Sequence, residues 1–283
     1  MGKKNFLRNH FIYHDYFARL KAISISLFKW NGLPETCNER FLEECLFRYG
    51  QAGFLEDEFM SYLNTKIIPS SELNVYEEPT AFTCFSVGYN RYKQKDECVW
   101  IRNNYLAKAT ETTTMIYAER LARIDLSYDV NIQAQKTPIL IHCDDKTKNS
   151  LENIYKQYSG DAPVIYVHKS MQEKPLEVLN TNAPFVADKL REEKANVWND
   201  YLEFLGVNTN PSDKKKERLI ISEVESNNEE VEIQGQTMLI CRQKACEEIN
   251  KLFGLNVSVE YRLDTLQKLK GEVNNGTVHD RTP

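Results

Sequence analysis

The stretch PILIHCDDKTKNSLENIYKQYSGDAPVIYVH, from Pro138 to His168, decides the fold of this chain. Its two apolar runs, 139–141 and 164–167, each follow a proline and predict short buried strands. Between them Ser150 can cap a short helix that ends at Gly160. Helical sequence flanks this strand-helix-strand unit on both sides. We therefore expect a small knob carried at the end of a pair of long helices.

The two long helices are predicted from apolar spacing and from their end signals. The first starts at Thr110 and must finish before Pro138, whose ring disfavours helix in the preceding residue. The second starts near Asn182, with Pro184 in its first turn, and ends at Gly206. Together with the predicted strands, they indicate an α+β protein that is mainly helical.

Further helices and strands are predicted in the N-terminal third. One apolar face runs from Asn5 to Trp30 and predicts a single helix. A second helix is expected to start after Asn38 and to end at Gly50. From 67 to 100 the helical period disappears among turn-forming residues, so short strands are expected there.

The C-terminal third begins with a polar segment. Between Asn208 and Gly235 a lysine-rich run is followed by a glutamate-rich run, and we expect a mobile loop. An amphipathic helix that stops at Gly254 and a strand around Val259 should follow.

Composition excludes several classes of protein. The 36 basic and 41 acidic side chains give a net charge of −5, so nothing global marks a nucleic-acid binder. The seven cysteines are odd in number and form no C-x-x-C pair, which favours reduced thiols. No membrane span or signal peptide is indicated, and the protein is interpreted as intracellular. Neither a P-loop nor a G-x-G-x-x-G motif is present.

Candidate sites for chemistry are few. His142, Cys143, Asp144 and Asp145 form the best metal-like cluster, but neighbours on a strand point to opposite faces. An α/β enzyme with its site around these residues remains the alternative function. We expect no enzyme activity, no metal and no cofactor. The basic residues gather in three places, each of which could be an ordinary solvated face or tail. They are Lys3, Lys4, Arg8, Arg19 and Lys21; Lys189, Arg191 and Lys194; and Lys214, Lys215, Lys216 and Arg218. A regulatory nucleic-acid binder would need a broader basic face.

Several strings resemble one protein family, in order, over roughly Leu20 to Asp264. They are LFKWNGLPETCNERFLEECLFRYGQAGF, QAQKTPILI, SLENIYKQYSGDAPVIYVH, TNAPFVADKLREEKANVWNDYLEFLG, KKER and RQKACEEINKLFGLNVSVEYRLD. The sequence resembles the portal proteins, also called head-tail connectors or upper collar proteins, of small short-tailed bacteriophages with protein-primed linear genomes and an RNA-assisted packaging motor.

This resemblance implies a portal fold and a ring of twelve subunits at one capsid vertex, through which double-stranded DNA passes during packaging and ejection. Residues 1–109 would form an N-terminal arm and wing, 110–135 and 176–206 the stem helices, 136–175 the clip, 207–235 a channel loop, and 236–283 a wing helix, strand and tail. The implied partners are the major capsid protein, a lower collar or tail protein, a packaging ATPase and a packaging RNA, with no membrane. The protein would lie in the virion at the head-tail junction, and in the host cytoplasm during assembly.

The resemblance also implies roles for the basic residues. Lys189 in VADKL and Lys215 and Lys216 in KKER match positions where the family lines its channel with lysine, and Lys214 and Arg218 flank them. Asn180 replaces a further channel lysine, so that ring is expected to be missing. Lys3, Lys4 and Arg8 lie in the arm with which family members contact the RNA and the motor.

Overall fold

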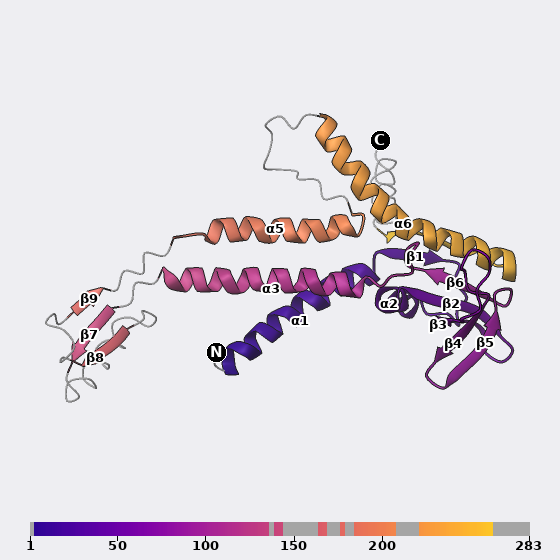
Figure 1. Ribbon diagram of the computed structural model, residues 1–283, viewed down its shortest axis with the longest axis horizontal. Helices are drawn as coiled ribbons and strands as arrows, with labels where there is room; N and C mark the ends of the chain where they lie inside the picture. The colour runs from indigo at the N-terminus through magenta and orange to yellow at the C-terminus, as the bar shows by residue number, and fades with distance from the viewer. Residues whose placement is uncertain are drawn as a thin grey trace, which may run out of the picture. The chain divides into compact units, whose positions relative to one another are not determined.

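The computed structural model describes residues 3–135, 139–143, 164–168, 176–178, 184–207 and 221–262, with side chains for 10–135, 184–207 and 237–262. The chain divides into two compact units (Figure 1). Unit 1 holds residues up to 119 and from 198 onward, and unit 2 holds residues 120–197. No described helix is long and apolar enough to cross a membrane.

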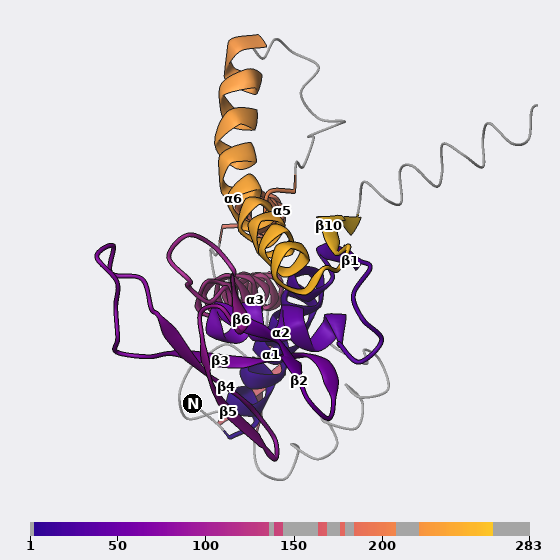
Figure 2. The same cartoon turned by 90° about the vertical axis from the view of Figure 1, so that its right-hand side faces the viewer.

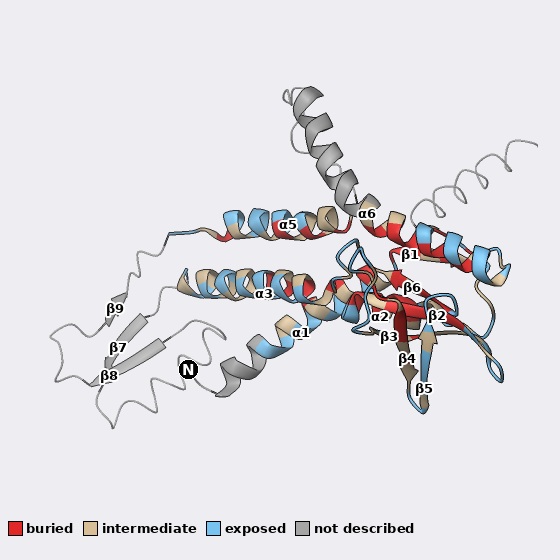
Figure 3. Ribbon diagram, turned by 45° about the vertical axis from the view of Figure 1, so that its right-hand side comes forward, coloured by how far each residue is buried: buried red, intermediate tan, exposed pale blue. Residues whose placement is uncertain are grey.

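A five-stranded antiparallel sheet organises unit 1. Its strands are β2 (Gln51–Asp57), β3 (Ser61–Pro69), β4 (Ala81–Ser86), β5 (Tyr89–Gln94) and β6 (Cys98–Arg102), in the order β5-β4-β3-β2-β6. Leu55, Ile67, Phe82, Cys84 and Cys98 form its buried core. Strands were predicted between 67 and 100, but β2 and the start of β3 were not. Figure 3 shows the buried residues concentrated on the sheet and the elements against it.

Helix α2 (Glu39–Tyr49) packs against this sheet and is bounded as predicted. The Asn38 side chain accepts a hydrogen bond from the Phe41 N–H at 2.9 Å, which satisfies one unpaired amide of the first turn. Gly50 ends the helix in the left-handed conformation at φ 75°. A Cβ at this glycine would collide with the backbone of Ala107, so the chain needs glycine here for two reasons.

The single N-terminal helix predicted from Asn5 to Trp30 is wrong beyond residue 25. Helix α1 covers Lys3–Ile25, and β1 (Phe28–Asn31) pairs antiparallel with β10 (Ser258–Tyr261), with Phe28 opposite Tyr261. Phe28 and Trp30 are buried, as alternation on a strand requires. A partner at the other end of the sequence overrides the local helical spacing.

Helix α6 (Ile221–Phe253) begins earlier than predicted. Its C-terminal part ends at Gly254 as expected and packs on β6 and β10 (Figure 2). The loop predicted for 207–235 is wrong for residues 221–235, which are helical. Residues 221–235 are rich in glutamate, which has a good helix propensity, so the polarity of this segment did not distinguish a helix from a loop. Residues 208–220 lie outside the described residues, as do those after 262, which include the tail predicted after Lys270.

Unit 2 contains most of α3 (Glu111–Ala134) and the start of α5 (Ala187–Phe204). Strand β7 (Ile139–Cys143) lies between β8 (Val164–His168), its parallel neighbour, and β9 (Leu176–Val178), its antiparallel neighbour. The two strands of the predicted knob are thus confirmed, while its short helix lies outside the described residues. The stem helix predicted for 176–206 is wrong at its start, because 176–178 pair as β9 and the helix begins at Ala187.

Candidate functional site

The α3 and α5 helices are held together in unit 2 by side chains of α3. Lys194 on α5 forms an ion pair with Asp125 on α3 at 2.7 Å. Asn131 accepts a hydrogen bond from the Val186 N–H at 3.1 Å and donates one to the Pro184 carbonyl at 2.9 Å. The Asn131 amide therefore satisfies the backbone just before α5, which explains why the helix starts at Ala187 and not near Asn182. Later residues of α3 contact earlier residues of the second segment, so the two helices are antiparallel and these contacts fix their register.

The exposed face of α5 carries one predicted channel residue, Lys189. The inward face repeats at three- and four-residue steps through Ala187, Leu190, Lys194, Val197, Tyr201 and Leu205. Lys189 lies on the other side and is exposed, as are Glu192, Glu193 and Asp200. Among the described residues Lys189 has no ion-pair partner within 4 Å, so its ammonium group remains available to a ligand. The other exposed charges of α5 are mostly acidic, with Arg191 as the exception.

The other predicted basic residues are not brought to this face by the described structure. Lys214, Lys215, Lys216 and Arg218 lie outside the described residues. The backbone of Lys3, Lys4 and Arg8 belongs to α1, whose side chains are described only from His10 onward. Their roles stay predictions.

The alternative enzyme site gains no support from the described residues. His142 and Cys143 lie at the end of β7, with side chains that are not described, and Asp144 and Asp145 fall outside the described ranges. In the part of the chain with described side chains, no three His, Cys, Asp or Glu residues could together hold a metal ion.

The described cysteines do not resemble activated nucleophiles. All six are free thiols, as predicted. Burial raises the pKa of Cys45 to about 11 and that of Cys246 to about 12, which keeps both protonated at neutral pH. A hydrogen bond from Cys98 lowers the pKa of Cys84, but Cys84 is fully buried in the core of the sheet.

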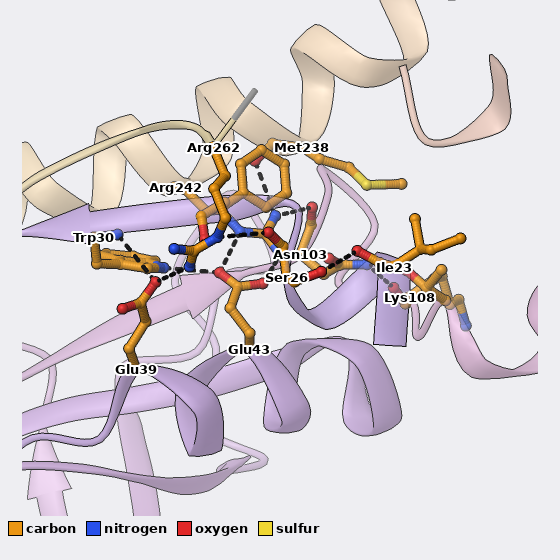
Figure 4. Close-up of polar contacts among 12 residues, drawn as sticks. Ile23, Ser26, Trp30, Glu39, Glu43, Asn103, Lys108, Met238, Arg242 and Arg262 are labelled. Carbon is orange, nitrogen blue, oxygen red and sulfur yellow. Dashed lines mark hydrogen bonds and ion pairs between the residues drawn. The ribbon is translucent and has the colours of Figure 1, made fainter. Parts of the chain in front are cut away.

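A buried polar network in unit 1 was missed by the sequence analysis (Figure 4). Arg242 on α6 donates from Nε and Nη2 to the Glu43 carboxylate on α2, at 2.9 and 2.8 Å. The Trp30 indole N–H donates to the same carboxylate at 2.8 Å, and the Asn103 side chain accepts from Arg242 at 3.1 Å. Both charged side chains are at most 3% exposed. The network thus joins α2, β1, α6 and the segment after β6.

A signal for this network does exist in the sequence. Glu43 lies on the apolar face of α2 beside Leu42 and Leu46, and Arg242 lies on the apolar face of α6 with Met238 and Ile249. A charged residue within an apolar stripe indicates a buried partner, since burying an unpaired charge is costly. The partner cannot be assigned from sequence, because the two residues are 199 positions apart.

The comparisons with known proteins decide what kind of molecule this is. The family model described as phage connector (GP10) matches residues 1–266. The chain belongs to the phage connector family. In structure, the connector is similar to a chain of the portal and tail of native bacteriophage P68, with 16% identity, a TM-score of 0.51 and coverage of 96% of this chain and 95% of that chain. A portal protein of the HK97 family from Corynebacterium diphtheriae is also similar, with 9% identity, a TM-score of 0.44 and coverage of 89% and 94%.

These findings confirm the predicted family and the α+β portal fold. As a member of this family, the chain is a virion protein of the head-tail junction. Its family is structural rather than catalytic.

Proposed function

We propose that twelve copies of the connector form a closed ring at one capsid vertex, and that double-stranded DNA passes through it during packaging and ejection. The family match over residues 1–266 carries this proposal. In a ring with rotational symmetry each subunit uses two different surfaces to meet its two neighbours. The packaging ATPase would be a separate partner, in keeping with the absence of a P-loop from the sequence.

The parts of the chain are assigned as follows. Residues 1–109 and 236–262 form the wing around the five-stranded sheet, α3 and α5 form the stem, and 136–175 form the clip. The segment 207–220, with Lys214, Lys215, Lys216 and Arg218, forms the channel loop. It resists backward movement of packaged DNA.

The charge of α5 suits a wall along which DNA slides. A pore for DNA of any sequence should avoid base contacts and should bind phosphate at few places, because each added lysine contact strengthens binding and its salt dependence. Lys189 is one cation on an acidic helix face, and twelve chains at −5 each total about −60. Such a channel repels DNA over most of its length and attracts it only at a few basic rings, those of Lys189 and of the channel loop.

Native mass spectrometry with electron microscopy tests the ring. A particle of about twelve chains with a central opening of roughly 20 Å, wide enough for a duplex, is expected. A protein that stays monomeric at every concentration, even with capsid protein present, would contradict the proposal.

The role of Lys189 is tested in assembled rings by the salt dependence of duplex binding. Lys189→Ala should weaken binding of every sequence alike and should lower the slope of log affinity against log salt. Lys108→Ala, at an exposed lysine just before α3, is the control and should leave the slope unchanged. Equal slopes for the two variants would mean that Lys189 does not face DNA.

The N-terminal arm is assigned to the packaging RNA and the motor through Lys3, Lys4 and Arg8. Replacing all three with alanine should leave ring assembly intact and weaken RNA binding, because three phosphate-binding cations are lost. Unchanged RNA binding would remove this role.

A further inference from the structure

The end of β2 and the turn that follows it, residues 56–60 (the β2–β3 turn), present large apolar side chains to solvent on an acidic segment. Phe59 is 88% exposed and Met60 is 54% exposed. Glu56 and Glu58 are also exposed, and neither has an ion-pair partner among the described residues. Phe59 and Met60 thus form a small apolar patch beside two carboxylates, and an exposed apolar patch rimmed by polar residues is a feature of interaction sites.

This β2–β3 turn is held in one conformation by its own hydrogen bonds. Oδ1 of Asp57 accepts from the Phe59 N–H at 3.0 Å and from the Met60 N–H at 3.2 Å. Its Oδ2 accepts from the Tyr89 hydroxyl at 2.9 Å. These bonds lower the pKa of Asp57, so the brace is present at neutral pH. Because the turn is fixed before any partner arrives, binding would cost little ordering entropy.

A cleft lies elsewhere in unit 1, between β6 and the last turns of α6. Its volume is about 350 Å³, within the range of sites that bind small groups. Phe82 and Trp100 of the sheet line it, and Leu252 of α6, which is 40% exposed, lines the facing side. The cleft therefore offers an apolar lining with room for an aromatic side chain.

The charges around this α6–β6 cleft are mostly basic. Lys95 is paired with Glu78 at 2.9 Å. Arg102, stacked over Trp100 at 5.0 Å, and Lys251 have no ion-pair partner within 4 Å among the described residues. Glu248 and Glu78 also line the cleft, so its charged lining comprises three basic and two acidic side chains. Two unpaired cations beside an apolar lining complement two unpaired carboxylates beside an exposed phenyl ring.

We propose that the β2–β3 turn of one connector subunit docks into the α6–β6 cleft of the next subunit. Phe59 enters between Trp100 and Leu252, and Glu56 and Glu58 approach Arg102 and Lys251. Each copy gives one turn and receives one turn, so the contact is heterologous and can be repeated around a ring. This inference rests on the proposed ring and names one contact that holds it together.

The test compares assembly of four single variants and one double variant over a range of subunit concentrations, by sedimentation velocity and native mass spectrometry. Phe59→Ser should raise the concentration for half assembly by about tenfold or more, as expected for a buried aromatic at an interface. Val87→Ser is the matched control, since Val87 is fully exposed on the neighbouring β4–β5 turn. Glu58→Lys and Lys251→Glu should each weaken assembly, and the double variant should recover most of the loss.

Circular dichroism of each variant confirms that unit 1 is folded. If Phe59→Ser and Lys251→Glu assemble like the wild type, the docking contact is wrong while the ring stands. The contact is equally overturned if Phe59→Ser forms normal rings that no longer join capsids, because the turn would then bind the capsid. If the wild type itself forms no ring under any condition, the proposed function fails first.

Discussion

Replacing Arg242 with methionine is expected to destabilise unit 1 by about 3 to 5 kcal/mol, the usual cost of removing one partner from a buried ion pair. The Arg242 and Glu43 side chains are 3% and 2% exposed, so water cannot replace the lost guanidinium. The carboxylate of Glu43 would keep one described donor, the Trp30 indole N–H. Methionine retains much of the volume that packs on Phe28, whose ring centroid lies 4.1 Å from the guanidinium carbon. The effect therefore reports mainly on charge.

Urea unfolding at one fixed subunit concentration measures this cost, because folding and assembly are linked. Arg19→Met is the control: its ion pair with Asp15 on α1 is more than half exposed, and such pairs contribute about 0.3 to 0.5 kcal/mol. The double variant Glu43→Met with Arg242→Met should recover part of the loss, since no unpaired buried charge remains. A loss below about 1 kcal/mol for Arg242→Met, or a double variant as unstable as the sum of the single ones, would refute the reasoning.

Three further outcomes are expected. Tyr201→Phe should cost about 1 to 2 kcal/mol in the same unfolding assay, because the buried hydroxyl contacts hydroxyls of α1 and α3 at 2.6 and 2.9 Å; a neutral result would show that water replaces it. Mass mapping after alkylation at pH 8 should find Cys45 and Cys246 unmodified until urea is added, since burial raises both pKa values and blocks access. The hydrogen bond from Lys21 lowers the pKa of Glu44 in the folded protein. The ionised Glu44 therefore stabilises the fold fully above its unfolded pKa of about 4.3, and this stabilisation is lost as the pH falls through the lower folded pKa. Lys21→Met should raise the NMR titration midpoint of Glu44 and make the stability of the fold less sensitive to acid.

Local signals predicted the elements whose boundaries are set by local chemistry. Asn38 and Gly50 bound α2 because a side-chain cap and a left-handed glycine act within a few residues. The start of α5 was misplaced by one turn, because the Asn131 side chain, on another helix, satisfies the backbone before it. Strand β1 was mistaken for helix because β10, its partner, follows α6 in the sequence. Where a distant partner decides the structure, local periodicity cannot identify it.

The function was predicted from family resemblance and not from individual residues. An enzyme displays its chemistry as side chains that converge within one chain, and the best such candidate in this sequence, the cluster from His142 to Asp145, has no described side chains. In the proposed conduit, by contrast, the functional features of one chain act only when several copies assemble. They are Lys189 on the exposed face of α5, the β2–β3 turn with Phe59, and the α6–β6 cleft. Each is unremarkable in a monomer, where an exposed lysine is an ordinary solvated residue. In the proposed ring, the same lysine would form a ring of charge, and the turn and cleft would form a continuous chain of contacts. Resemblance to a family therefore predicted the role of the protein, whereas no single residue did. Variants at Phe59 test the proposed contact between subunits, and variants at Lys189 test the proposed contact with DNA in the channel.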